Sequence, residues 1–123
     1  MKKILSYLET VPQISEILAP SHKKFKGYAL WKKQFTGATG LFSIVLDKKY
    51  DMPDIYKMCA YEIFSPGASW GGYESLVRHL HIDTVRTATR GKYKNSAFRF
   101  YIGLENADDL IKDLAAGFKR LAG

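Results

Sequence analysis

The feature that most constrains this chain is the strict alternation of side chains over residues 96–105. Side chains on a β-strand point alternately to opposite faces, so this run predicts a strand with two unlike faces. One face carries Phe98, Phe100 and Ile102, and the other carries Ala97, Arg99 and Tyr101. The first face predicts packing against a core. The second combines a small residue, a guanidinium and a phenol, and it predicts a surface that meets a ligand or another surface.

Arg99 is the charge in the middle of this strand, and a planar guanidinium has the geometry that binds a carboxylate. From the residues alone, the alternative is that Arg99 pairs with a neighbouring glutamate or points into solvent. Both interpretations stay open at this point.

Length and composition limit the class of protein. A chain of 123 residues that is 46% hydrophobic and 25% charged predicts one globular domain and excludes intrinsic disorder, although it is short for an enzyme that encloses a cofactor. The single cysteine, Cys59, excludes an internal disulfide and a cysteine-rich zinc site, and it favours a reducing compartment such as the cytoplasm. Glu9 interrupts any apolar leader, and no run approaches the ~20 apolar residues that span a bilayer. We therefore expect a soluble cytoplasmic protein without a signal peptide.

The net charge of +7 comes from 19 lysines and arginines against 12 acidic residues, and part of it is concentrated between residues 23 and 33. A basic stretch interleaved with aromatic rings is typical of grooves that bind single-stranded nucleic acid, so a small basic nucleic-acid-binding module is the alternative function. No recognisable nucleic-acid motif accompanies the stretch, and lysine-rich surfaces are common, so this partner is less favoured. The stretch contains Lys23, Lys24, Lys26, Lys32 and Lys33 around Phe25, Tyr28 and Trp31.

Periodicity and terminating residues predict the other elements. Helical spacing of apolar residues predicts helices over residues 2–10, over 27–35, from Asp51 to about Ala60, and from Asn106 onwards. Strands are predicted at 13–18 on a sheet edge, at 41–46 with both faces buried, and at 62–64. Residues 65–72 are predicted to form a loop, and residues 73–93 receive no assignment.

Particular side chains are expected to share a face within these elements. Ile14 and Leu18 lie on one side of the first strand, and Ile55, Tyr56 and Cys59 form one stripe of the helix that Asp51 caps. The last helix, capped by Asn106, carries a stripe of Leu110, Leu114, Phe118 and Leu121. The order of elements predicts an α+β fold in a single domain over residues 1–123: a small, mainly antiparallel sheet of about four strands with helices on one face.

Other reactive residue types do not form a site. His22, His79 and His81 are predicted at the surface. Cys59 falls on an apolar helix stripe, where a buried thiol is far commoner than a nucleophile. Ser69 lacks the strand-to-helix G-x-S-x-G elbow, so a serine hydrolase is disfavoured.

Three motifs along the chain resemble one enzyme family. They are residues 35–43 (FTGATGLFS), 69–76 (SWGGYESL) and 99–105 (RFYIGLE), the last followed by acidic and apolar residues of the final helix. Together they resemble the C-terminal domain of the Cys/Met-metabolism enzymes that depend on pyridoxal phosphate (PLP). The Ser-Trp-Gly-Gly form of the second motif favours the cystathionine β-lyase branch over the γ-synthases and γ-lyases. The resemblance extends from the first helix to the last residue.

This resemblance implies a carbon-sulfur lyase that converts cystathionine to homocysteine, pyruvate and ammonia, in transsulfuration and methionine biosynthesis. It also implies that Arg99 holds the substrate α-carboxylate, assisted by Ser69 and by the backbone near Trp70. It places no catalytic residue, cofactor-binding residue or metal ligand in this chain. Ala68 departs from the family pattern, in which an aromatic residue commonly precedes the serine, so that wall of the pocket differs.

The family's large PLP-binding domain, with its Schiff-base lysine and phosphate site, is expected to be absent from this chain. No lysine directly follows a serine or threonine, and no glycine cluster marks a phosphate-binding turn between a strand and a helix. Residues 1–123 are therefore expected to be a fragment, the substrate-carboxylate domain, without bound PLP and with little or no lyase activity alone. The expected partners are the large domain, a small amino-acid thioether and further copies of the chain, but no membrane.

Overall fold

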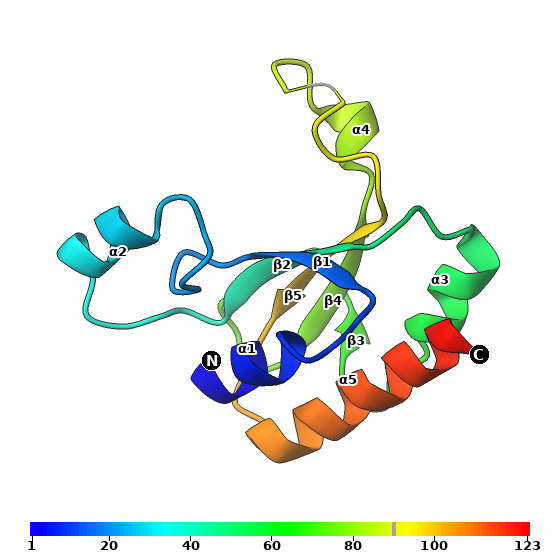
Figure 1. Ribbon diagram of the computed structural model, residues 1–123. Coiled ribbons are helices and arrows are strands. Elements are labelled where there is room, and N and C mark those ends of the chain that lie inside the picture. The colour runs from blue at the N-terminus through cyan, green and yellow to red at the C-terminus, as the bar shows by residue number, and fades with distance from the viewer. Residues whose placement is uncertain (90) are drawn as a thin grey trace.

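The computed structural model describes residues 1–89 and 91–123 and shows a single sheet with helices packed on it (Figure 1). The sheet has five strands in the order β1-β2-β5-β4-β3, of which β3 and β4 run parallel and the other neighbours antiparallel. The predicted α+β class and the mainly antiparallel sheet are confirmed, but the strands number five rather than about four. They are β1 (Ile14–Leu18), β2 (Leu41–Leu46), β3 (Ser65–Pro66), β4 (Leu76–Leu80) and β5 (Ala97–Tyr101).

Helices α1 and α5 lie under one face of the sheet, and α3 packs beside α5 (Figure 1). Helices α2 and α4 project away from this layer, and none of the side chains of α2 is buried. The helices are α1 (Lys2–Leu8), α2 (Tyr28–Gln34), α3 (Met52–Met58), α4 (Ile82–Val85) and α5 (Ala107–Ala122). No helix in the described residues is both long and apolar enough to cross a bilayer.

The core lies between the sheet and helices α1, α3 and α5. Phe98 and Phe100 of β5 are fully buried, as their alternation predicts. The ring of Phe100 stacks on Phe42 of β2 at 5.6 Å between centroids and meets Phe64 edge-on at 5.3 Å. All four residues of the predicted stripe on α5 are buried, and the Asn106 side chain caps this helix by accepting a backbone N–H of its first turn.

The predicted strand at residues 62–64 is wrong, and β3 follows directly after it. The cause is Asp113, a buried carboxylate on α5. Its Oδ1 accepts the backbone N–H of Glu62 at 2.9 Å, and its Oδ2 accepts those of Ile63 at 2.8 Å and Phe64 at 3.1 Å. Since a side chain satisfies these three donors, the segment needs no strand partner.

The first strand is confirmed at a sheet edge, but Ile14 and Leu18 do not share a face. The register shifts between Ile14 and Glu16, so Ile14 pairs with Leu46 while Leu18 pairs with Ser43. Residues three apart on β2 point to opposite faces, and the same is therefore true of their partners. A bulge of one residue reverses the face that simple alternation assigns.

Two other packing predictions are wrong in part. On α3 the buried residues are Ile55 and Met58, while Tyr56 is 69% exposed and Cys59 is half-buried. On β2 the second face is only partly buried: Val45 is buried, but Leu41 and Ser43 are half-buried, and no helix of the described residues covers this face.

Of the histidines, His22 is not at the surface. It is only 6% exposed, and its Nε2 lies 2.8 Å from the Glu9 carboxylate. His79 is half-buried with its ring 4.6 Å from that of His81, which is exposed. Burial, and then the neighbouring imidazole of His81, lower the pKa of His79 below its ordinary value.

Candidate carboxylate-binding site

Arg99 lies on the face of the sheet that is turned away from α1, α3 and α5, which we call the open face (Figure 1). Strand β5 is central, so Arg99 has a register partner on each side, Ser43 of β2 and Arg78 of β4. The open face includes Leu41, Ser43 and Val45 of β2, Leu76, Arg78 and Leu80 of β4, and Ala97, Arg99 and Tyr101 of β5. The prediction that Arg99 lies opposite the core is confirmed.

The loop over residues 67–72 crosses this face from the sheet edge to the centre. It leaves the edge at Gly67, whose N–H donates to the Val77 carbonyl at 3.1 Å. The guanidinium of Arg99 donates from Nη2 to the Ala68 carbonyl, and the Tyr101 hydroxyl donates to the Gly72 carbonyl at 3.0 Å. Two alternate side chains of β5 therefore hold the loop at two points.

Ser69 and Trp70 lie between these two points. Both residues are exposed, with 62% of Trp70 accessible, and within the described residues the Ser69 hydroxyl makes no hydrogen bond. Gly71, which follows them, has a φ of +86°, a conformation that L side chains rarely adopt. The fold thus brings Arg99, Ser69 and Trp70 into one region.

Arg99 keeps donors available for a ligand. Its only acceptor in the described part of the chain is the Ala68 carbonyl, bound by Nη2. Nε and Nη1 have no partner there, and no carboxylate lies within 4.0 Å of the guanidinium. A guanidinium oriented by one hydrogen bond can present its other N–H groups to a carboxylate. The alternative in which Arg99 pairs with a neighbouring glutamate is not what the structure shows.

A second set of contacts, between Ser75 and Glu105, holds the far end of the loop and was missed by sequence reasoning. Ser75 donates its N–H at 3.0 Å and its hydroxyl at 2.7 Å to the Glu105 carboxylate, and its Oγ accepts the N–H of Gly103 at 2.9 Å. A Cβ on Gly103 would overlap the Tyr73 carbonyl oxygen, so glycine is required for this close crossing. Partial burial acts to raise the pKa of Glu105, but the hydrogen bonds from Ser75 outweigh it and lower that pKa.

Glu105 and Ser75 both fall inside the motifs, and the available signal was the position of a serine three residues after a double glycine. Arg78 was missed for a different reason, because residues 73–93 received no assignment.

A hollow of about 640 Å³ lies over β1, β2 and α4, and Ser43, the register partner of Arg99 on β2, is in its wall. Three cations line it, namely Lys26, Arg86 and Lys92, together with one carboxylate, that of Glu16. This hollow on the open face therefore carries a surplus of positive charge.

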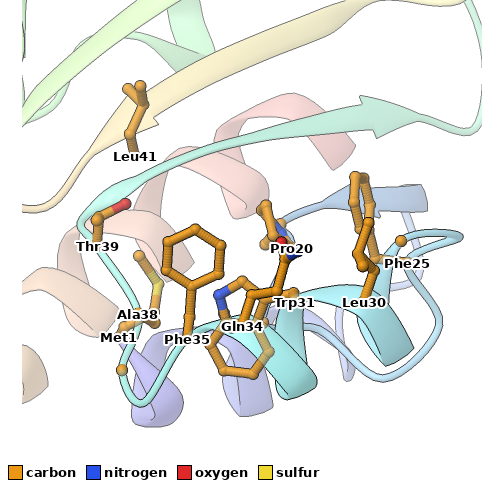
Figure 2. Close-up of a pocket in the computed structure, with 14 residues that line it drawn as sticks. Met1, Pro20, Phe25, Leu30, Trp31, Gln34, Phe35, Ala38, Thr39 and Leu41 are labelled. Carbon is orange, nitrogen blue, oxygen red and sulfur yellow. The ribbon is translucent and has the colours of Figure 1, made fainter.

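The basic and aromatic stretch lies elsewhere, around α2. Phe25 and Trp31 line an apolar cavity of about 410 Å³ between α2 and the start of β2, together with Leu30 and Phe35 (Figure 2). Two of the three aromatic rings of the stretch therefore belong to a cavity wall, whereas stacking on single strands needs a row of free ring faces. This arrangement gives the nucleic-acid alternative no added support.

Comparisons with known proteins identify the protein family. The profile of the Cys/Met metabolism PLP-dependent enzymes matches residues 1–119. The chain belongs to this family.

Within the family, the chain is similar to β-lyases. It is 42% identical over 123 residues to the cystathionine beta-lyase of Salmonella typhimurium, covering 97% of this chain and 31% of that protein. It is 36% identical to the L-alanine/L-glutamate racemase of Wolbachia pipientis, covering 97% and 30%. A crystal structure of cystathionine gamma synthase from Xanthomonas oryzae superposes with a TM-score of 0.80 at 25% identity, covering 98% of this chain and 32% of that one. The chain therefore spans about a third of the length of the relatives it matches.

Proposed function

We propose that this chain is the substrate-carboxylate domain of a PLP-dependent carbon-sulfur lyase similar to cystathionine β-lyase. The observation that carries the proposal is the state of Arg99: one hydrogen bond to the Ala68 carbonyl orients the guanidinium, and within the described residues Nε and Nη1 have no partner. In this proposal Arg99 binds the α-carboxylate of an amino-acid thioether such as cystathionine.

Ser69 and the backbone at Trp70 are proposed to assist Arg99 from the anchored loop. Holding the carboxylate fixes the direction of the substrate's Cα–H bond, which is the bond that must be aligned for proton removal. PLP, when bound, supplies the electron sink for that step. The contribution of this chain is orientation, and Arg99 is the residue on which orientation depends.

The residues around Arg99 do not by themselves fit PLP. The open-face positions of β2, β4 and β5 include no lysine, and within the described residues no helix begins beside the loop at Gly71 and Gly72 to bind a phosphate. In the proposal, the cofactor and its lysine come from a large domain that docks on the open face. The chain alone is then expected to have little or no lyase activity.

The proposal is tested with two preparations. In one, the chain is mixed with a separately produced large domain of the Salmonella enzyme; in the other, it replaces the matching third of that enzyme as a chimera. Pyruvate release from cystathionine is measured in both. Arg99→Ala is expected to lower turnover at least about tenfold, because losing a charge-assisted pair in a partly desolvated site costs about 2–5 kcal/mol.

The variants separate geometry from charge. Arg99→Lys is expected to rescue only in part, since an ammonium keeps the charge but loses the planar fork. Lys119→Ala, which removes a positive charge from the exposed side of α5, is the control and is expected to leave turnover unchanged. Full turnover in a folded Arg99→Ala chimera would refute the assignment.

A further inference from the structure

Arg78 stands directly beside Arg99 on the open face. The two are register partners on the antiparallel strands β4 and β5. Directly opposed residues of an antiparallel pair point to the same face, with Cβ atoms about 4.5–5.5 Å apart. Arg78 is exposed, and the positions before and after it on this face are Leu76 and Leu80. Two guanidinium groups thus emerge side by side between apolar neighbours.

This pair lacks neutralising charges. Like charges directly opposite each other destabilise a sheet. Within the described residues, no carboxylate lies within 4.0 Å of Arg78 or Arg99. The acid on this face, Glu16, pairs with Val45 on the far side of β2, two strands away from β5. Among the residues that the structure describes, no acidic side chain therefore neutralises the pair.

The two arginines are also held differently. Arg99 is oriented by the Ala68 carbonyl, whereas Arg78 makes no hydrogen bond through its side chain within the described residues. The oriented guanidinium of Arg99 suits a ligand group that must be held in one direction. The guanidinium of Arg78 can adjust its position to bind a second group on the same ligand. A ligand with two carboxylates a few bonds apart matches this arrangement, because each carboxylate can bind a separate guanidinium.

We infer that Arg78 is a specificity-determining residue, which binds the second carboxylate of dicarboxylic amino acids whose α-carboxylate is bound by Arg99. The inference rests on the proposed function for its α-carboxylate half. Arg78 adds preference among substrates: compounds with a second carboxylate near the first gain a contact, and compounds with one carboxylate do not.

The inference is tested on the isotope-labelled chain by following the Nε–Hε signals of its arginines by NMR. The probes are glutarate, with two carboxylates, and butyrate, with one, titrated at equal ionic strength because exposed charge pairs are screened by salt. Glutarate is expected to bind about tenfold more tightly than butyrate and to shift both Arg78 and Arg99, in line with one additional charge-assisted pair.

Two variants test whether Arg78 causes the preference for glutarate over butyrate. Arg78→Leu is expected to reduce glutarate binding to the level of butyrate and to leave butyrate binding at Arg99 unchanged. Lys119→Leu, which removes one positive charge from α5, is the control for net charge and is expected to keep the preference. Backbone amide spectra of each variant establish that it is folded.

The outcomes separate the two proposals. Equal affinities for glutarate and butyrate, with Arg99 still responding to both, would overturn the role of Arg78 while the carboxylate role of Arg99 stands. Equal weakening of both ligands by Arg78→Leu would also overturn it, because a general anion effect confers no preference. Absence of any response at Arg99 would overturn the inference together with the proposed function.

Discussion

The single most informative change for the architecture of this domain is the removal of the Asp113 carboxylate. Asp113 joins α5 to the segment that leads into β3 and then into the loop over Arg99, and it is buried to 7% exposure. Replacing it by alanine leaves three backbone N–H groups without their acceptor. One of them, on Phe64, is buried, and the other two are partly buried.

The size of the effect follows from these three contacts. A hydrogen bond to a charged group contributes about 1.5–3 kcal/mol, and a buried donor left unpaired loses about 1–3 kcal/mol. Water can partly reach the N–H groups of Glu62 and Ile63, so the loss of each of these hydrogen bonds is taken at the low end of its range. The higher helix propensity of alanine offsets about 0.5 kcal/mol of the total loss. We expect Asp113→Ala to lower the free energy of unfolding by about 3–4 kcal/mol, a large part of the roughly 5–15 kcal/mol of a typical domain.

Urea denaturation followed by circular dichroism measures this loss. Asp113→Asn is expected to cost less, about 2 kcal/mol, because its single carbonyl oxygen accepts but its NH₂ group faces N–H donors. Asp109→Ala is the matched control on the same helix. Asp109 is exposed, and among the described residues it pairs only with Lys112, at 3.3 Å, a contact worth about 0–1 kcal/mol. If Asp113→Ala cost no more than Asp109→Ala, the three hydrogen bonds would not be what holds the segment to α5.

Three further predictions concern other contacts. Gly117→Ala is expected to destabilise the domain by about 1–3 kcal/mol despite the better helix propensity of alanine, because its Cβ would overlap the Tyr61 ring; thermal unfolding checks this. The pKa of Glu105 is lowered from 4.5 in the folded state, so its contribution to stability is present above that value and lost as the pH falls through the lowered pKa. Urea titrations from about pH 5 to about pH 3 are therefore expected to show a steeper loss of stability for the native chain than for Glu105→Gln. In that variant the group that Ser75 contacts does not titrate. Burial raises the pKa of Cys59 to about 11 against a smaller opposing effect of Arg120. At neutral pH its reaction with a disulfide reagent is expected to be about 100-fold slower than in the urea-unfolded chain, and equal rates would contradict a shielded thiol.

Sequence reasoning succeeded where the signal is local. The alternation around Arg99, the cap at Asn106 and the stripe that ends with Leu121 are each determined by neighbours within a few residues, and the structure confirms all three. The position of Arg99 on the non-core face, and hence half of the candidate site, could therefore be predicted.

The failures come from contacts between residues distant in sequence. Leu76 and Leu80 are four residues apart, which fits one face of a helix and one face of a strand equally well, so β4 and with it Arg78 were missed. The segment from Glu62 was assigned as a strand because its composition suits one, but an acceptor about fifty residues later in the chain satisfies its N–H groups. His22 looked exposed among lysines, and only the fold brings Glu9 to its ring.

The position of β5 in the sheet has a consequence for synthesis. β5 is the last strand in the sequence but the central one in space, between β2 and β4. Without residues 97–101, no strand joins the β1–β2 pair to the β3–β4 pair, and the inner edges of β2 and β4 lack their partner. Unpaired edges recruit other strands, and proteins are synthesised from the N-terminus at about 5–20 residues per second. The sheet of this chain therefore cannot be completed before β5 is synthesised, and the insertion of this single strand pairs both inner edges at once.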